Sequence, residues 1–259
     1  MGKWSDDTLL AARRREFLGV PLHDLDMAET LTLAETAMRN RRPMLHTALN
    51  VAKLVNMGQN AELFEDVSGA DIINVDGAGI VLGARLLGIP VKTRVAGVDL
   101  MAELLALCAD RGYRPFLLGA EQAVLDAMAA ELQRRHPRLE LAGMQHGYFG
   151  AEEEADIVAA INRSGADCLF VALPTPRKER FLKRYRTMLA PSFVMGVGGS
   201  FDVYGGKVRR APALVQRLGF EWLFRVVQEP RRLWRRYYVT NTAYAALLWD
   251  AFRRRRALR

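Results

Sequence analysis

Residues 71–90 read DIINVDGAGIVLGARLLGIP. The apolar run over 71–75 predicts a buried strand, which ends at Asp76-Gly77. The next stretch, 79–87, predicts a helix that Gly88 closes. A strand that passes through a short turn into a helix is the building unit of a parallel α/β sheet.

The same unit recurs along the chain. Further strands are predicted over 43–49, 114–118, 139–144, 168–173 and 193–197. Further helices are predicted over 29–40, 51–58, 99–111, 121–135, 152–163 and 177–189. Strands separated by helices of this length indicate a mainly parallel sheet with helices on both faces. We therefore expect an α/β, Rossmann-like fold.

The pattern changes after Pro212, where one helix is predicted over 213–228 and another over 230–254. Residues 207–259 carry 14 basic residues against three acidic ones, whereas residues 1–206 carry 23 basic and 26 acidic residues. The middle of the last helix, 237–252, is mostly apolar but too short to span a bilayer, and it suits a membrane interface. We expect a catalytic core over 1–206 and a basic, amphipathic, membrane-associating helical appendage over 207–259.

The rest of the chain has no apolar run of membrane-spanning length. Its first residues lack the apolar stretch of a secretory signal, so a cytoplasmic location is expected. Cys108 and Cys168 lie in apolar surroundings and are expected to be buried, reduced thiols rather than a disulfide.

Ligands bind beyond the carboxyl ends of the strands in open parallel sheets. Asn50, Asp76, Gly119 and the stretches 174–178 and 198–202 hold such positions. A carboxylate at Asp76 can accept the proton of a sugar hydroxyl that attacks an anomeric carbon. The alternative is that Asp76-Gly77 only forms a turn.

Other segments offer contacts to phosphate. The glycines of 196–202 let a backbone approach a phosphate or nucleoside closely, although a plain turn explains them equally well. Arg225, Arg232 and Arg236 would share one face of a continuous helix, and Arg231 and Arg235 are i, i+4 neighbours. Guanidinium groups suit a diphosphate, and the alternative is a solvated basic surface.

The sequence lacks the common zinc and serine-hydrolase motifs. Asp24 and Asp26 have the spacing of a metal-binding Asp-x-Asp, but they precede a helix and are expected to cap it. The four histidines are expected to be structural. They are His23, His46, His136 and His146.

Several ordered motifs resemble the WecG/TagA/CpsF family of bacterial glycosyltransferases. They are Ala48-Leu49-Asn50, the ADxxxxDGxGI run over 70–80, 94–99, 116–119, LFVALPTPRKE over 169–179, 196–202, Gly206-Lys207, 210–212, 219–222, Arg225 and Glu229-Pro230. Each motif is weak by itself, but the ordered set extends over about residues 18–240 and is specific.

This resemblance implies an inverting transferase that moves a hexose-type sugar from a UDP-sugar to a polyprenyl-diphosphate-linked sugar without a cofactor or catalytic metal. It implies that Asp76 is the base and that Asn50, Arg225, Arg232 and Arg235 act beside it. Donor-binding positions are then expected at Thr47, Arg94, Gly119, Lys178, Gly198, Gly199 and Asp202. The acceptor implies work at the inner leaflet of the cytoplasmic membrane, in cell-surface or exopolysaccharide synthesis.

Two positions depart from the family pattern. Ala48 stands where threonine is usual, and Lys178 replaces the glutamine of Pro-Lys-Gln-Glu. The donor sugars of well-known relatives therefore do not transfer automatically to this chain. A homo-oligomer that hides the apolar face of the appendage is a further expectation. The competing interpretation is a basic membrane- or nucleic-acid-binding module with an inactive α/β core; we expect no nucleic-acid partner.

Overall fold

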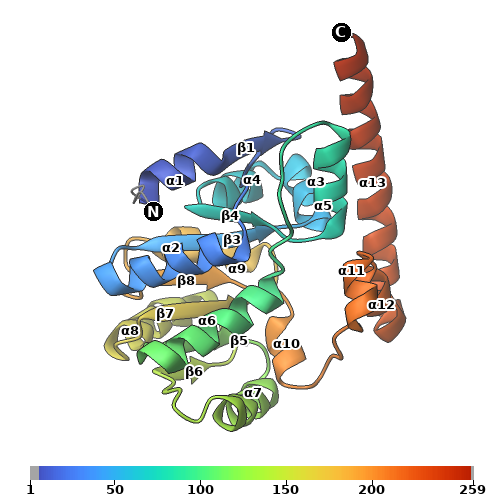
Figure 1. Cartoon of the computed structure of the whole chain (residues 1–259). Coiled ribbons are helices and arrows are strands. Elements are labelled where there is room, and N and C mark those ends of the chain that lie inside the picture. Colours follow the sequence, from blue (N-terminus) through green and yellow to red (C-terminus); the bar gives the residue numbers. More distant parts are fainter. Residues whose placement is uncertain (1–5, 258–259) are drawn as a thin grey trace.

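The computed structural model describes residues 6–257 and has a six-stranded parallel sheet at its centre (Figure 1). The strands are β3 (Met44–Leu49), β4 (Ile72–Val75), β5 (Pro115–Gly119), β6 (Gly143–Gln145), β7 (Cys168–Ala172) and β8 (Phe193–Gly196). Their order is β4-β3-β8-β7-β5-β6, and every neighbouring pair is parallel. The predicted α/β fold with a mainly parallel sheet is confirmed.

Helices cover both faces of this sheet, so alternate residues of one strand enter different cores. Phe170 of β7 packs with α2 (Met27–Asn40), α6 (Gly97–Arg111), α7 (Gln122–Arg135) and α10 (Ser200–Tyr204). Its neighbour Val171 packs on the other face with α8 (Glu154–Arg163) and α9 (Arg177–Tyr185). Burial on both faces explains why the strands are continuous apolar runs.

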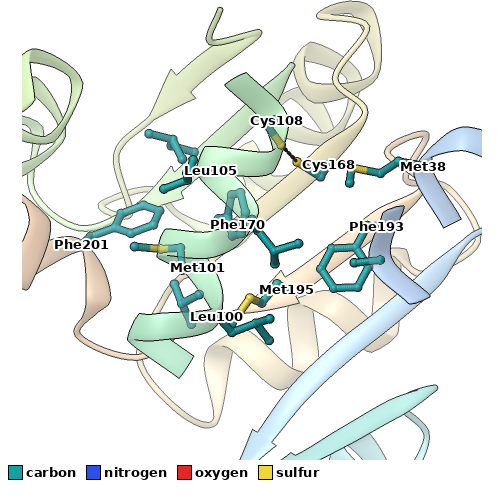
Figure 2. Packing of buried hydrophobic residues seen from close by; sticks show 14 of the residues in the cluster. Met38, Leu100, Met101, Leu105, Cys108, Cys168, Phe170, Phe193, Met195 and Phe201 are labelled. Atoms are coloured by element: carbon teal, nitrogen blue, oxygen red, sulfur yellow. Dashed lines mark hydrogen bonds between the residues drawn. The ribbon is translucent and has the colours of Figure 1, made fainter. Parts of the chain in front are cut away.

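The two cysteines lie in the first of these cores (Figure 2). Cys108 of α6 and Cys168 of β7 are buried and free, and their Sγ atoms are 3.7 Å apart. The prediction of buried thiols is confirmed.

The chain moves along the sheet in one direction from β3 to β4 and in the opposite direction from β4 to β5. From β3 it passes through α3 (Val51–Gln59) and α4 (Ala61–Ser68) to the edge strand β4, and then through α5 (Ala78–Leu86) and α6 to β5 on the other side. The last strand, β8, returns to lie between β3 and β7. The carboxyl ends of β4, β3 and β8 therefore lie side by side, where ligands bind in sheets of this kind.

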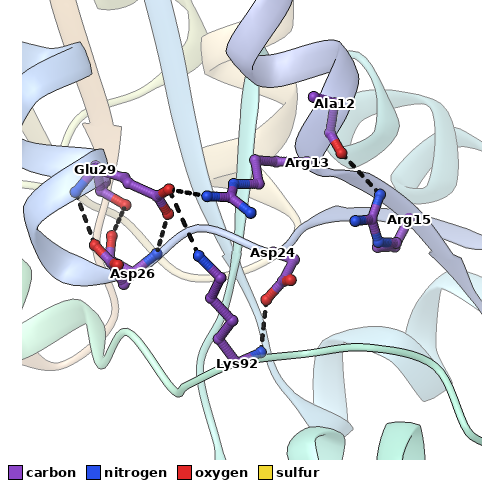
Figure 3. A network of polar contacts seen from close by, with 8 residues as sticks. Ala12, Arg13, Arg15, Asp24, Asp26, Glu29 and Lys92 are labelled. Carbon is purple, nitrogen blue, oxygen red and sulfur yellow. Dashed lines mark hydrogen bonds and ion pairs between the residues drawn. The ribbon is translucent and has the colours of Figure 1, made fainter. Parts of the chain in front are cut away.

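An N-terminal unit precedes the sheet and was not predicted. It consists of α1 (Asp6–Arg13) and an antiparallel hairpin of β1 (Arg14–Phe17) and β2 (Val20–His23). Asp26 caps α2 by accepting from the Glu29 amide at 2.8 Å, within a capping box, as the sequence predicted (Figure 3). Glu29 also pairs with Arg13, which attaches α1 to α2.

Most predicted elements differ by up to three residues at an end, and three differ more. β6 (Gly143–Gln145) overlaps the predicted 139–144 strand only at 143–144, and α9 ends at Tyr185 rather than at 189. The predicted helix over 213–228 is wrong: it consists of α11 (Ala213–Arg217) and α12 (Glu221–Gln228). Gly219 lies between them with φ +79°, and this left-handed conformation interrupts a right-handed helix.

The last helix, α13 (Pro230–Ala257), runs along the molecule beside α3 and α5, and its C-terminal end extends past them (Figure 1). The buried Tyr244 attaches it to α5: its hydroxyl donates to the Gly79 carbonyl at 2.8 Å. No helix between residues 6 and 257 is both long enough and apolar enough to cross a membrane.

Candidate active site

Asn50 and Asp76 lie next to each other because their strands are neighbours in register. Leu49 of β3 pairs with Val75 of β4, and the Asp76 amide donates to the Leu49 carbonyl at 2.8 Å. Asn50 caps α3 by accepting from the Lys53 amide at 2.9 Å. A Cβ on Gly77 would lie 3.9 Å from Cβ of Asn50, so the two strand ends form one surface.

Asp76 has the electrostatic surroundings of a general base. Its side chain is half-buried, and the loss of solvent raises its pKa. Arg94 and the backbone amide of Gly97 oppose that shift by stabilising the carboxylate, while the carboxylate of Glu221 adds to it. A carboxylate with a raised pKa accepts a proton more readily than an ordinary one, and an adjacent arginine keeps it ionised.

Arg94 is held near Asp76 by the loop between α5 and α6. The Val95 amide of this loop donates to the Val75 carbonyl at 2.9 Å, which attaches the loop to the edge strand β4. The Lys92 amide donates to Oδ1 of the buried Asp24 at 2.6 Å (Figure 3). Asp24 therefore fixes the backbone of the loop that carries Arg94.

A buried polar cluster lies beside this pair, at the ends of β3, β7 and β8. Nζ of Lys53 donates to Oγ1 of Thr47 at 2.9 Å and lies 3.1 Å from Oε1 of Glu179. Nζ of Lys178 lies 3.5 Å from the same oxygen and donates to the Val197 carbonyl at 3.0 Å. Two ammonium groups thus share one carboxylate, which leaves an excess of positive charge below the strand ends.

The pKa values of the cluster follow from this arrangement. Burial and the neighbouring charge of Lys53 lower the pKa of Lys178 to about 8, against the attraction of Glu179. Burial raises the pKa of Glu179, but Lys53 and Lys178 outweigh it and bring that pKa to about 2. Oε2 of Glu179 is buried and has no hydrogen-bond partner among residues 6–257.

The glycine-rich exit of β8 is open on one side and covered on the other. Gly198 is exposed, with no atom within 4 Å of the position that a Cβ would take. A Cβ on Gly199 would collide with Nη2 of Arg225 and lie 3.4 Å from Oδ2 of Asp202. Arg225 therefore reaches from α12 to the exit of β8.

The C-terminal segment covers the site through α12. Gly219 packs so closely on Ala78 at the start of α5 that a Cβ would clash, and Glu221 pairs with Arg94 at 3.2 Å. The side chain of Arg232 lies outside the described part of the structure, and Arg235 is exposed on α13. Because α12 ends before Pro230, Arg225 and Arg236 lie on separate helices and do not share the face that a continuous helix would give them.

The structure thus brings Asn50, Asp76 and Arg94 together, with Thr47 and Lys178 in the adjoining buried cluster. Gly119 lies apart from these residues at the end of β5, which β7 separates from β8. A Cβ at this position would collide with the backbone of Ala172, so the close approach of β5 and β7 requires a glycine here. Sequence reasoning did not single out Lys53, Glu179 or Glu221. The charged Lys53 in the otherwise apolar stretch 51–55 was the one available signal for the first of them.

Comparison with known proteins places the chain in a family. The sequence model described as "Glycosyl transferase WecG/TagA/CpsF family" matches residues 15–258. An N-acetylglucosaminyldiphosphoundecaprenol N-acetyl-β-D-mannosaminyltransferase of Bacillus spizizenii W23 is 38% identical over 179 residues, which are 69% of this chain and 68% of that protein. The protein of the same name from Bacillus subtilis 168 is 34% identical over 178 residues, 69% of this chain and 68% of its own.

A parallel sheet whose carboxyl edge carries an aspartate beside arginines, together with these relatives, defines a glycosyltransferase. The chain belongs to the WecG/TagA/CpsF family.

Proposed function

We propose that this enzyme transfers a hexose-type sugar from a UDP-sugar, with inversion, to a sugar linked through diphosphate to a polyprenol. The observation that carries the proposal is the placement of Asp76 beside Asn50 and Arg94 at the end of β4. The names of the two Bacillus relatives support the acceptor class, because both describe transfer to N-acetylglucosaminyl-diphospho-undecaprenol.

In the proposed reaction, Asp76 accepts the proton of an acceptor hydroxyl. The oxygen attacks the anomeric carbon of the donor from the side opposite UDP, the new carbon–oxygen bond forms, and the bond to the diphosphate breaks. Negative charge develops on the departing UDP, and we propose that Arg94 near Asp76 and Arg225 at the exit of β8 stabilise it. We propose that these guanidinium groups, rather than a metal ion, neutralise the diphosphate.

The open backbone at Gly198 supports this exit of β8 as the donor side, because a nucleotide could approach it closely. Lys178 fixes the backbone position of the same exit, because its ammonium group donates a hydrogen bond to the Val197 carbonyl. Since Lys178 and Ala48 depart from the family pattern, we propose a hexose such as glucose as the donor sugar rather than N-acetylmannosamine.

We propose that α13 docks on the inner leaflet of the cytoplasmic membrane, where a polyprenyl acceptor would be found. Trp234, Tyr238 and Trp249 are 57%, 66% and 62% exposed and share one helical face, turned away from the buried Leu233 and Tyr244. Arginines lie at both ends of this aromatic stripe, where they can bind anionic lipid head groups. A homo-oligomer that covers the stripe in solution is part of the same proposal.

Vesicle sedimentation tests the docking. Wild-type protein should sediment with vesicles that contain phosphatidylglycerol, and Trp249→Glu should weaken this by about tenfold or more. Tyr148→Glu is the matched control, because Tyr148 is 69% exposed on the core. Equal sedimentation of wild type and Trp249→Glu would remove α13 as the docking surface.

A transfer assay tests the activity itself. Purified enzyme in detergent and EDTA is given a panel of UDP-sugars and polyprenyl-diphosphate-linked monosaccharides, and the products are identified by mass. One donor–acceptor pair should give a disaccharide-lipid that is absent with Asp76→Asn. No transfer across the panel, together with tight binding of lipid or RNA, would favour the competing binding module.

A further inference from the structure

Glu221 occupies a position that the proposed reaction does not yet explain. It lies in the first turn of α12, and its carboxylate is about three-quarters shielded from solvent, with 24% of the side chain exposed. Oε2 lies 3.2 Å from Nη1 of Arg94 in the loop before α6. Oε1 lies 3.9 Å from Nε of Arg210 in the segment that leads to α11.

These contacts belong to a chain of four charges that crosses from core to appendage. Arg210 also pairs with Asp99 in the first turn of α6, so Arg94, Glu221, Arg210 and Asp99 alternate in sign. Nε of Arg210 is a buried donor with no hydrogen-bond partner among residues 6–257, and Glu221 is the carboxylate beside it. A small inward movement of α12 would turn this ion pair into a hydrogen bond.

We propose that Glu221 is a positioning residue: its carboxylate joins Arg94 to Arg210, holds α12 closed over Asp76 and sets the charge around that base. This inference rests on the proposed function, because it takes Asp76 as the base. Closure brings Arg225 to the exit of β8, since Glu221 and Arg225 lie one helical turn apart on α12.

The charge around Asp76 comes from three sides. Arg94 from the loop and Lys53 from α3 favour its ionised form, and Glu221 from α12 disfavours it. Removing the charge of Glu221 therefore lowers the pKa of Asp76 and moves the acid limb of the kcat/KM profile to lower pH. Exposure of Asp76 by an opened α12 would move the limb in the same direction, because burial raises the pKa of Asp76; a variant that keeps the charge at position 221 separates the two effects.

The test compares Glu221→Gln with Glu221→Asp in full-length enzyme of confirmed fold. We expect Glu221→Gln to lower kcat/KM by about tenfold, as for the loss of a charged hydrogen bond, and to move the acid limb downward. Amide exchange over 221–228 should become faster. Glu221→Asp keeps the charge and should leave the limb at its wild-type position. Glu131→Gln is the control, because Glu131 pairs with Arg134 and Arg135 within α7.

Two results overturn the proposal. One is that the amides of residues 221–228 exchange at the same rate in Glu221→Gln as in wild type, because α12 would then close without this carboxylate. The other is faster exchange with an unmoved acid limb, because the carboxylate would then not act on the base. If Glu221→Gln is too slow for a pH profile, amide exchange alone decides. If wild-type enzyme transfers no sugar, the proposed function fails, and amide exchange still tests closure.

Discussion

Lys53 and Glu179 form an ion pair between α3 and α9, with Nζ 3.1 Å from Oε1, and more than nine-tenths of each side chain is buried. The pair connects the helix that follows β3 with the helix that follows β7, and β8 lies between these two strands. Removing one partner of a buried ion pair leaves an uncompensated charge, which is costly.

We therefore expect Glu179→Gln to lower the free energy of unfolding by about 3–5 kcal/mol at neutral pH. The pKa of Glu179 is lowered from 4.5 to about 2 in the folded protein, so its stabilisation is complete above 4.5 and is lost as pH falls toward 2. Urea unfolding of wild type and variant between pH 7 and pH 3 should show the difference shrinking with acidity. A difference that is constant with pH would rule out the ionised pair as its source.

Asp76→Asn should separate activity from stability. Loss of the base should reduce kcat by about 10²–10⁴-fold. Because burial raises the pKa of Asp76 in the folded protein, ionisation costs stability as pH rises past its ordinary value of 3.8, and the asparagine avoids that cost. The Tm of Asp76→Asn should exceed that of wild type at neutral pH and approach it below pH 3.8. A variant that is stabilised but still transfers sugar at the wild-type rate would exclude Asp76 as the base.

Lys178→Gln restores the residue that is usual in the family. The folded protein lowers the pKa of Lys178 from 10.5 to about 8, so the lysine costs stability below pH 8 and the cost disappears above 10.5. We expect a higher Tm at pH 7 and a changed KM for the donor with kcat nearly unchanged, because Lys178 acts on the β8 exit through the Val197 carbonyl.

Lys183→Gln is the control for that variant, since Lys183 is half-exposed on the same helix and pairs with Glu65 and Asp66. Steady-state kinetics with a series of UDP-sugars provides the measurement. The same donor preference in wild type and Lys178→Gln would mean that Lys178 does not adjust the donor side.

The sequence was informative where function depends on strand ends. Asn50 and Asp76 follow apolar strands, and parallel strands end on the same edge, so their general location was predictable. Their proximity depends on β3 and β4 being neighbours. The Lys53–Glu179 pair depends on the order β3-β8-β7, which periodicity does not encode.

Two local features with positive φ also escaped prediction. Leu18 and Gly19 turn the β1–β2 hairpin with φ +50° and +78°. A hairpin turn with positive φ at both positions is usually signalled by Asn-Gly, and leucine gives no such signal. Residues 213–228 were predicted as one helix, but Gly219 ends α11 with a positive φ and packs against Ala78, so the glycine was a local stop signal that the prediction did not use.

The packing of α13 on α5 gives the last prediction. A Cβ on Gly83 would collide with the Tyr244 hydroxyl and lie 2.9 Å from Leu248 Cδ2 and 3.0 Å from Phe17 Cζ. Because three side chains converge there, α13 must shift, and we expect Gly83→Ala to cost about 1–3 kcal/mol of stability by overpacking.

Gly58→Ala is the matched control, since Gly58 lies in α3 with nothing within 4 Å of its Cβ position. It should raise stability by about 0.4–1 kcal/mol by restricting the unfolded chain. Urea unfolding measures both variants, and transfer assays should show a loss only in Gly83→Ala, because α12 and α13 are joined and a displaced α13 moves Glu221 and Arg225. Equal stability of Gly83→Ala and wild type would mean that α13 does not pack on α5 in solution.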